Sequence, residues 1–200
     1  MRKRKTLVML LPNKKYNIIY ADPAWSYNEN WGNGAVKHHY ETMSVKDIID
    51  LPVKDIADDN CHLYLWYTNP FVREAHEVCD AWGFEYKQTL TWVKQYSNKK
   101  VETGLGYYFR GATEHILFGV KGKLPRQRKD LKNLIETDGH AVYEINSRRH
   151  SEKPDLFRDI IVQHSGDLPR IELFSRHKMN DWEVWGNEIE ETTTLSEFFT

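Results

Sequence analysis

Short apolar runs alternate with amphipathic stretches along this chain, a pattern that predicts strands alternating with helices. The run at 61–67, Cys-His-Leu-Tyr-Leu-Trp-Tyr, is mostly apolar throughout, as in a strand of a sheet that is covered on both faces. Other strands are predicted at 17–21, 86–94, 115–120, 171–174 and 182–185. The fold class that follows is α/β, with a doubly wound, Rossmann-like sheet.

Helix signals fall between these runs. Ser44 and Asp47 form a capping-box-like start, with Asp in place of Glu, for a helix over 44–56. A second helix is predicted over 70–82, and a third opens at Lys153 with a proline in its first turn. Ligands of such folds bind at the carboxyl ends of the strands, so the residues that follow strands are the first candidates for a site.

The length of 200 residues predicts one domain over 1–200. Within it we expect a basic N-terminal arm over 1–15, a basic loop region over 121–150 and a polar tail over 190–200. The two cysteines form no C-x-x-C pair, so neither a disulfide framework nor a metal site is predicted. Reduced cysteines and the lack of a long apolar run predict a cytoplasmic protein without a membrane span.

Charge limits the partners of the chain. The formal net charge is −1, so contact with a nucleic acid needs a local basic patch. One such patch is predicted in the segment that contains Lys121, Lys123, Arg126, Arg128, Lys129 and Lys132. The alternative is a solvated charged loop.

The segment Asp22-Pro23-Ala24-Trp25 follows the first strand and leads into a Gly/Asn-rich stretch. An exocyclic adenine amine is a poor nucleophile, because its lone pair is delocalised into the ring. The Asp22 carboxylate and the Pro23 carbonyl are two acceptors for its hydrogens, and Trp25 offers a plane for stacking. These residues therefore suit methylation of that nitrogen. Asp-Pro is also common in turns, and Trp25 also suits a core.

The same segment resembles the Asp-Pro-Pro-Trp motif of the adenine-N6 methyltransferases. That family includes the catalytic subunit of the eukaryotic messenger-RNA adenosine methyltransferase and small phage and bacterial DNA adenine methyltransferases. The resemblance extends from about Tyr16 to Glu188. Supporting blocks, in order, are Tyr-Glu-Thr-Met-Ser at 40–44, Leu-Tyr-Leu-Trp at 63–66, Thr-Trp-Val-Lys at 91–94, Glu-His-Ile-Leu at 114–117, His-Ser-Glu-Lys-Pro-Asp at 150–155, Ile-Glu-Leu-Phe-Ser-Arg at 171–176 and Trp-Gly-Asn-Glu at 185–188. Ala24 departs from the motif, in which a second proline is usual.

The resemblance implies a permuted order, with the catalytic motif before the cofactor half, and this explains why no G-x-G-x-x-G occurs. It implies S-adenosyl-L-methionine as the cofactor. Lys153 would face the cofactor's carboxylate and Asp22 its amino group. Residues expected near its ribose and adenine are Arg176, Asn187 and Glu188, and His177 or Lys178 is expected nearby. The alternatives are a solvated helix start for Lys153 and plain solvent exposure for Glu188.

Further residues resemble positions on the target-base side: Tyr40, Glu114, Arg148 and Ser151. Packing, a surface ion pair and a helix cap are the alternatives for Tyr40, Glu114 and Ser151. A mobile gate is predicted over 28–39. The function implied is methyl transfer to adenine N6 in nucleic acid, with DNA favoured by the compact length. RNA as substrate and a catalytically silent, nucleic-acid-binding partner subunit remain alternatives, as does pairing into a homodimer or with a related subunit.

Overall fold

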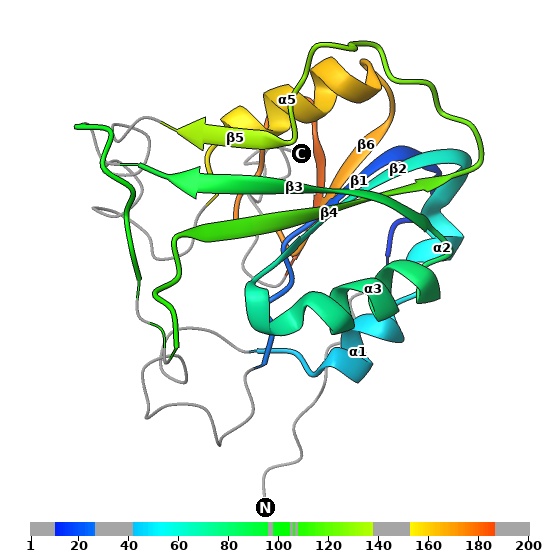
Figure 1. Ribbon diagram of the computed structural model, residues 1–200. Coiled ribbons are helices and arrows are strands. Elements are labelled where there is room, and N and C mark those ends of the chain that lie inside the picture. Colours follow the sequence, from blue (N-terminus) through cyan, green and yellow to red (C-terminus); the bar gives the residue numbers. More distant parts are fainter. Residues whose placement is uncertain are drawn as a thin grey trace, which may run out of the picture.

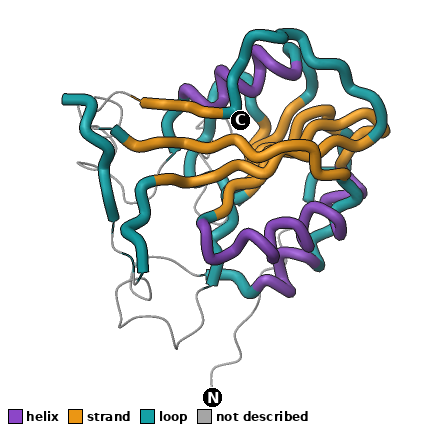
Figure 2. Tube along the Cα trace, viewed as in Figure 1, coloured by secondary structure: helices purple, strands orange, loops and turns teal. Residues whose placement is uncertain are grey.

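The fold is a mixed sheet between two helical layers (Figures 1 and 2). A computed structural model describes residues 11–26, 42–95, 98–104, 106, 108–137 and 153–186. It contains a seven-stranded sheet of order β5-β3-β4-β2-β1-β6-β7. The strands are β1 (Tyr16–Ala21), β2 (Ala57–Tyr67), β3 (Glu85–Lys94), β4 (Thr113–Lys121), β5 (Leu134–Thr137), β6 (Arg170–Leu173) and β7 (Glu183–Trp185). This confirms the predicted α/β class.

The directions of the strands distinguish two edges of the sheet. β1 is parallel to β2 and β6, β3 to β5, and β6 to β7, whereas β4 is antiparallel to both β2 and β3. The carboxyl ends of all these strands except β4 therefore share one edge of the sheet. β4 contributes its amino end to the same edge. We call this the site edge, and the other one the far edge.

Alternating side chains of β1 serve the two faces of the sheet. Ile19 and Ala21 belong to a buried cluster that includes side chains of α1 (Val45–Ile49), α2 (Val53–Ile56) and α3 (Val72–Ala81). Ile18 and Tyr20 belong to a second cluster, with Phe157 of α5 (Leu156–Ser165). Figure 2 shows the helices on opposite faces of the strands.

The predicted elements differ from the observed ones in three places. The helix expected over 44–56 is two short helices, because Pro52 stands between them as the N-cap of α2. The helix expected over 70–82 begins with a 3₁₀ turn, η1 (Asn69–Phe71). The basic region expected to be all loop contains β5, whose strand pattern is only four residues long and stands among charged residues.

The predicted basic patch begins where β4 ends, at the far edge of the sheet (Figure 1). Lys121 donates its Nζ to the Ala57 carbonyl at 3.1 Å, beside the start of β2. The Gln127 amide donates to the His164 carbonyl, near the end of α5, at 2.7 Å. The patch and the carboxyl end of β1 therefore lie at opposite edges of the sheet. The sequence alone does not reveal this separation.

Cys61 and Cys79 are free and buried. No helix within the described residues is long and apolar enough to cross a membrane.

A buried histidine connects the sheet, α5 and the far-edge loop. The His62 ring nitrogens lie 2.8 Å from Ser165 Oγ and 2.9 Å from the Leu124 carbonyl oxygen. The pKa of His62 is lowered to about 4, mainly by burial and to a smaller extent by His164, whose ring is 5.5 Å away, while the hydrogen bond to Leu124 partly opposes this. His62 therefore stays neutral in the folded protein where an unfolded histidine, with a pKa of ~6.5, takes up a proton.

We therefore expect the free energy of unfolding to fall as the pH drops from about 6.5 to 4, because the unfolded chain binds that proton and the folded chain does not. His62→Gln should flatten this part of the pH profile. Urea titrations at successive pH values measure it, with His76→Gln as the control variant. An unchanged slope in His62→Gln would assign the acid sensitivity to other groups.

Candidate functional site

Asp22 stands just beyond the end of β1, at the site edge. Alternation along an extended chain puts it on the same face as Tyr20, the face that α5 covers. Lys153 lies three residues before the first residue of α5 and reaches across to it, with Nζ 2.8 Å from Asp22 Oδ2. The Lys153 side chain is only 8% exposed, which excludes the solvated helix start as its environment.

Glu114 completes a charged cluster, which we define as Asp22, Lys94, Glu114 and Lys153. Lys153 Nζ lies 3.4 Å from Glu114 Oε2, and Lys94 Nζ lies 2.5 Å from Glu114 Oε1. Both ammonium groups also lie over indole rings, Lys153 at 5.0 Å from Trp66 and Lys94 at 4.7 Å from Trp92. The structure thus brings together three of the predicted residues, Asp22, Glu114 and Lys153, and adds Lys94.

Lys153 and Glu114 stay ionised despite their burial. Burial acts most strongly on Lys153 and favours the neutral amine, but Asp22 and Glu114 outweigh it and raise the pKa of Lys153. Burial also opposes ionisation of Glu114, and Lys153 and Lys94 together reverse this and lower the pKa of its carboxyl group. Two cations balance two carboxylates at neutral pH.

Backbone hydrogen bonds fix the turn that follows Asp22. The Trp25 amide donates to the Pro23 carbonyl at 2.9 Å, which sets the direction of that carbonyl. The Met43 amide donates to the Ala24 carbonyl at 2.9 Å, so the turn is tied to the segment before α1. Ala24 thus contributes a carbonyl to this arrangement, which does not depend on its side chain.

The side chain of Trp25 is part of the core. Trp25 is 7% exposed, its indole N–H donates to the Trp66 carbonyl at 3.0 Å, and its ring stacks on Phe71 with a centroid separation of 5.2 Å. In this conformation the ring stacks on Phe71 and is almost completely covered by protein. Stacking on a base, the role expected from sequence, would need its other face to be uncovered.

The segment after β6 lies against the end of β7. Phe174 has a φ of 65°, and the Ser175 amide donates to the Trp185 carbonyl at 3.1 Å. A Cβ on Gly186 would lie 2.0 Å from the Ser175 carbonyl oxygen, so only glycine allows this approach. The two expected cofactor segments, at Arg176-His177 and after Gly186, therefore start from one place.

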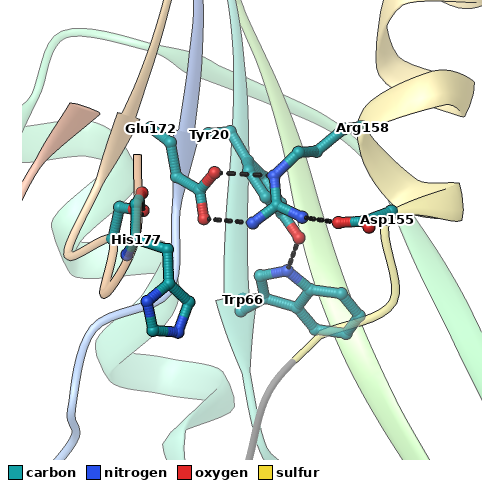
Figure 3. Close-up of polar contacts among 7 residues, drawn as sticks. Tyr20, Trp66, Asp155, Arg158, Glu172 and His177 are labelled. Carbon is teal, nitrogen blue, oxygen red and sulfur yellow. Dashed lines mark hydrogen bonds and ion pairs between the residues drawn. The ribbon is translucent and has the colours of Figure 1, made fainter. Parts of the chain in front are cut away.

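Sequence reasoning missed a second polar group on the α5 face, formed by Tyr20, Trp66, Arg158 and Glu172 (Figure 3). Arg158 donates to both oxygens of Glu172, with Nε–Oε2 at 2.7 Å and Nη2–Oε1 at 2.8 Å. Trp66 donates its indole N–H to the Tyr20 hydroxyl at 2.7 Å. Asp155, just before α5, also accepts from Arg158. The available signal was Glu172, a carboxylate inside the apolar run of β6.

This second group attaches α5 to β6. Burial, as the larger influence, raises the pKa of Glu172, and the Arg158 guanidinium partly offsets it. A bidentate pair of this kind fixes both position and angle. The segment that carries Lys153 is thereby held in register with the strand that leads to Arg176.

Several predicted residues lie outside the described part of the chain: Tyr40, Arg148, Ser151, Asn187 and Glu188, together with the predicted gate over 28–39. Most of the predicted N-terminal arm and the whole of the polar tail also lie outside it. The described residues that could hold a zwitterionic cofactor are Lys153, for a carboxylate, and Asp22, for an ammonium group. Their opposite charges, at the site edge beside the end of β1, fit such a molecule.

Comparisons with known proteins match most of the chain. A family model described as MT-A70 matches residues 16–188. The Type II methyltransferase M.MunI of Mycoplasma sp. is 33% identical over 90% of this chain and 80% of its own length. The human N(6)-adenine-specific methyltransferase METTL4 is 27% identical over 88% of this chain and 38% of its own. The human N(6)-adenosine-methyltransferase catalytic subunit METTL3 is 28% identical over 88% of this chain and 28% of its own. The chain thus spans most of the Mycoplasma relative but well under half of either human protein.

The lowered pKa of Glu114 makes the stability of the fold depend on pH. Ionised Glu114 stabilises the fold above the ordinary glutamate pKa of ~4.3, and this contribution is lost as the pH falls through its lower folded value. Glu114→Gln should therefore destabilise the protein at pH 7, by about 3 kcal/mol if Lys153 and Lys94 are left without this partner. The difference from wild type should shrink at pH values below that range.

Unfolding in urea at pH 7 and under acid conditions measures this difference. Glu85→Gln, which removes a more exposed carboxylate paired with Lys87, is the matched control and should change stability by less than about 1 kcal/mol. Equal effects of the two variants at pH 7 would show that Glu114 is not coupled to the charged cluster.

Proposed function

This chain belongs to the MT-A70 family of N6-adenine methyltransferases, and from that premise we propose that it transfers a methyl group from S-adenosyl-L-methionine to the exocyclic N6 of adenine in DNA. The observation that carries the proposal is the buried Lys153–Asp22 pair beside the backbone turn at Pro23. It places Lys153, which is expected to bind the cofactor, next to Asp22, the predicted catalytic acid.

The cofactor, when bound, supplies an electrophilic methyl group. The chain's own part is to hold the two ends of the reaction in line. Lys153 binds the carboxylate of the cofactor's methionine portion, and Asp22 faces its amino group. Arg176 and His177 follow the turn after β6, and with Asn187 and Glu188 they complete our proposal for the ribose and adenine side.

The target amine is held by Asp22 and the Pro23 carbonyl. A carboxylate has two oxygens and about four acceptor positions, so the hydrogen bond from Lys153 to Oδ2 leaves acceptor capacity for an amine. The Pro23 carbonyl already accepts from the Trp25 amide, which fixes its direction, and its second lone pair can accept from the same amine. Drawing both N–H groups toward acceptors frees the nitrogen lone pair for attack.

We assign Trp25 to anchoring as well as to the expected stacking. Its backbone amide orients Pro23, and its buried ring holds that amide in place. Glu114 has a positioning role, because it is a second carboxylate in contact with Lys153, with Oε2 3.4 Å from Nζ. We assign Tyr40, Arg148 and Ser151 to the target-base side, as their sequence context suggests.

Two observations support DNA over RNA. The Mycoplasma relative, of which this chain covers 80%, is named a Type II methyltransferase, and we read that designation as pointing to DNA. The chain covers only 28% of METTL3, whose name specifies adenosine, so the remaining length of that protein has no counterpart in the match. RNA remains the second candidate substrate, on the strength of that same likeness.

The expected result is N6-methyladenine in DNA that has been incubated with the purified protein and isotope-labelled S-adenosyl-L-methionine, measured by mass spectrometry of the nucleosides. Asp22→Ala and Asp22→Asn should reduce the rate by about 100-fold or more, because one acceptor for the amine is lost or weakened. Asp50→Asn, a change on the exposed surface of α1, should keep the wild-type rate.

The same assay with RNA distinguishes the second candidate. Methyladenine in RNA alone would replace DNA as the substrate. If neither nucleic acid is methylated while calorimetry shows that the cofactor binds, the chain is a silent binding subunit. An active Asp22→Ala variant would remove Asp22 from the mechanism.

Lys153→Met tests the cofactor half separately. The variant keeps a side chain of similar length but has no charge for the cofactor's carboxylate. We expect cofactor affinity to fall by about tenfold or more in calorimetry. Lys46→Met, on the exposed surface of α1, is the control. Unchanged affinity in Lys153→Met would place the cofactor elsewhere.

A further inference from the structure

The connection between β3 and β4 carries the most exposed aromatic side chains of the described chain. Phe109 is 90% exposed and Tyr108 is 81% exposed, whereas the next large apolar side chain, Leu134, is 52% exposed. We call residues 98–112 the aromatic loop, of which the structure describes 98–104, 106 and 108–112. Full exposure of a phenylalanine is costly in water, so this loop calls for an explanation.

The aromatic loop starts and ends at the site edge. β3 ends at Lys94 and β4 begins at Thr113, so the loop leaves from Lys94 of the charged cluster and returns to Glu114. Phe109 precedes Glu114 by only five residues in the chain. An extended chain of that length spans at most about 18 Å, roughly the length of five stacked base pairs.

Backbone contacts hold Phe109 in its exposed position. The Gly104 amide donates to the Gly111 carbonyl at 2.6 Å, closing the base of a turn. Arg110 donates to the carbonyls of Thr103 and Gly104, both at 3.1 Å. A Cβ on Gly106 would lie 1.8 Å from the Phe109 carbonyl oxygen, so the backbone passes too closely for any other residue. The turn is built locally, and its tip is presented to solvent.

The charge of the aromatic loop is opposite to that of the whole chain. Residues 98–112 contain Lys99, Lys100 and Arg110 and one acid, Glu102, which gives +3 − 1 = +2, against −1 for all 200 residues. All three cations are exposed. Positive charge beside exposed aromatic planes is the combination by which proteins hold nucleic-acid strands, with cations on the phosphates and rings on the bases.

We infer that the aromatic loop is a nucleic-acid contact, in which Phe109 stacks on a base a few nucleotides from the target adenine and the neighbouring cations bind the phosphates. This inference rests on the proposed function, since it names where the substrate of the same site is held. It also replaces the basic patch at 121–132, which lies at the far edge, as the nucleic-acid surface nearest to Asp22.

A nucleic acid suits this surface better than a second copy of the chain. The chain as a whole is slightly negative, and the loop's charge complements phosphates more strongly than such a surface. The loop also exposes two aromatic rings that are adjacent in the chain, Tyr108 and Phe109. An interface of typical size instead buries about 800 Å² on each partner.

Phe109→Ala tests the inference in the full chain, with a fluorescein-labelled, adenine-containing 30-nucleotide DNA as the probe. We expect the dissociation constant to rise by about tenfold, the order of one lost stacking contact, with cofactor affinity unchanged. The slope of log affinity against log salt should stay at its wild-type value, because no charge is removed. Phe109→Trp should retain wild-type binding, since it keeps an aromatic plane. Val72→Ala, on the exposed side of α3, is the matched control.

Each outcome decides between the alternatives. Wild-type DNA affinity in Phe109→Ala, with methylation intact in the wild type, would overturn the contact and leave the proposed function standing. A second outcome is that sedimentation shows a dimer for the wild type and a monomer for Phe109→Ala, with the DNA affinity per protomer unchanged. That result would mean that the loop contacts a second copy of the chain, and it would overturn the inference. Absence of any nucleic-acid methylation by the wild type would sink the proposed function and this inference with it.

Discussion

The site depends on the ion pairs that the buried ammonium group of Lys153 makes with two carboxylates. This ammonium group is 2.8 Å from Asp22 and 3.4 Å from Glu114, so it connects the residue after β1 with the second residue of β4. An uncompensated charge in this position would cost several kcal/mol, so the ionised forms of Lys153 and Glu114 depend on each other. The bidentate Arg158–Glu172 pair then fixes α5, and the segment that carries Lys153, against β6. The turn at Pro23, Lys153 and β6 are thereby held as one unit.

Much of this arrangement could be predicted from the sequence. Apolar runs identify the long strands, because buried strands carry few polar residues, and the resemblance in the order of motifs places Asp22 and Lys153 in one site. Local patterns could not show how the strands pair. The antiparallel direction of β4 brings Glu114 to the site edge and sends the basic stretch after Lys121 to the far edge. Both results depend on contacts between residues that are distant in the chain.

Two other misses have local causes. β5 is four residues long and half exposed, so its period of two could not stand out from the charged residues around it. Trp25 fits a base-stacking role and a core role equally well by composition. The hydrogen bond to the Trp66 carbonyl and the stacking on Phe71, which give it a core position, join residues 41 and 46 positions apart in the chain. Such aromatic residues beside a catalytic motif can serve the chemistry by fixing the backbone.

The reversed direction of β4 has a consequence for how this enzyme scaffold can change. Because β3 and β4 are neighbours joined at the site edge, their connection can lengthen or shorten without altering a single strand pairing, and the entropic cost of extra loop residues grows only slowly with length. The length of this connection, and the target that it contacts, can then change while Asp22, Glu114 and Lys153 stay in place. The strand pairings thus hold the charged cluster in place while the connection beside it is able to vary.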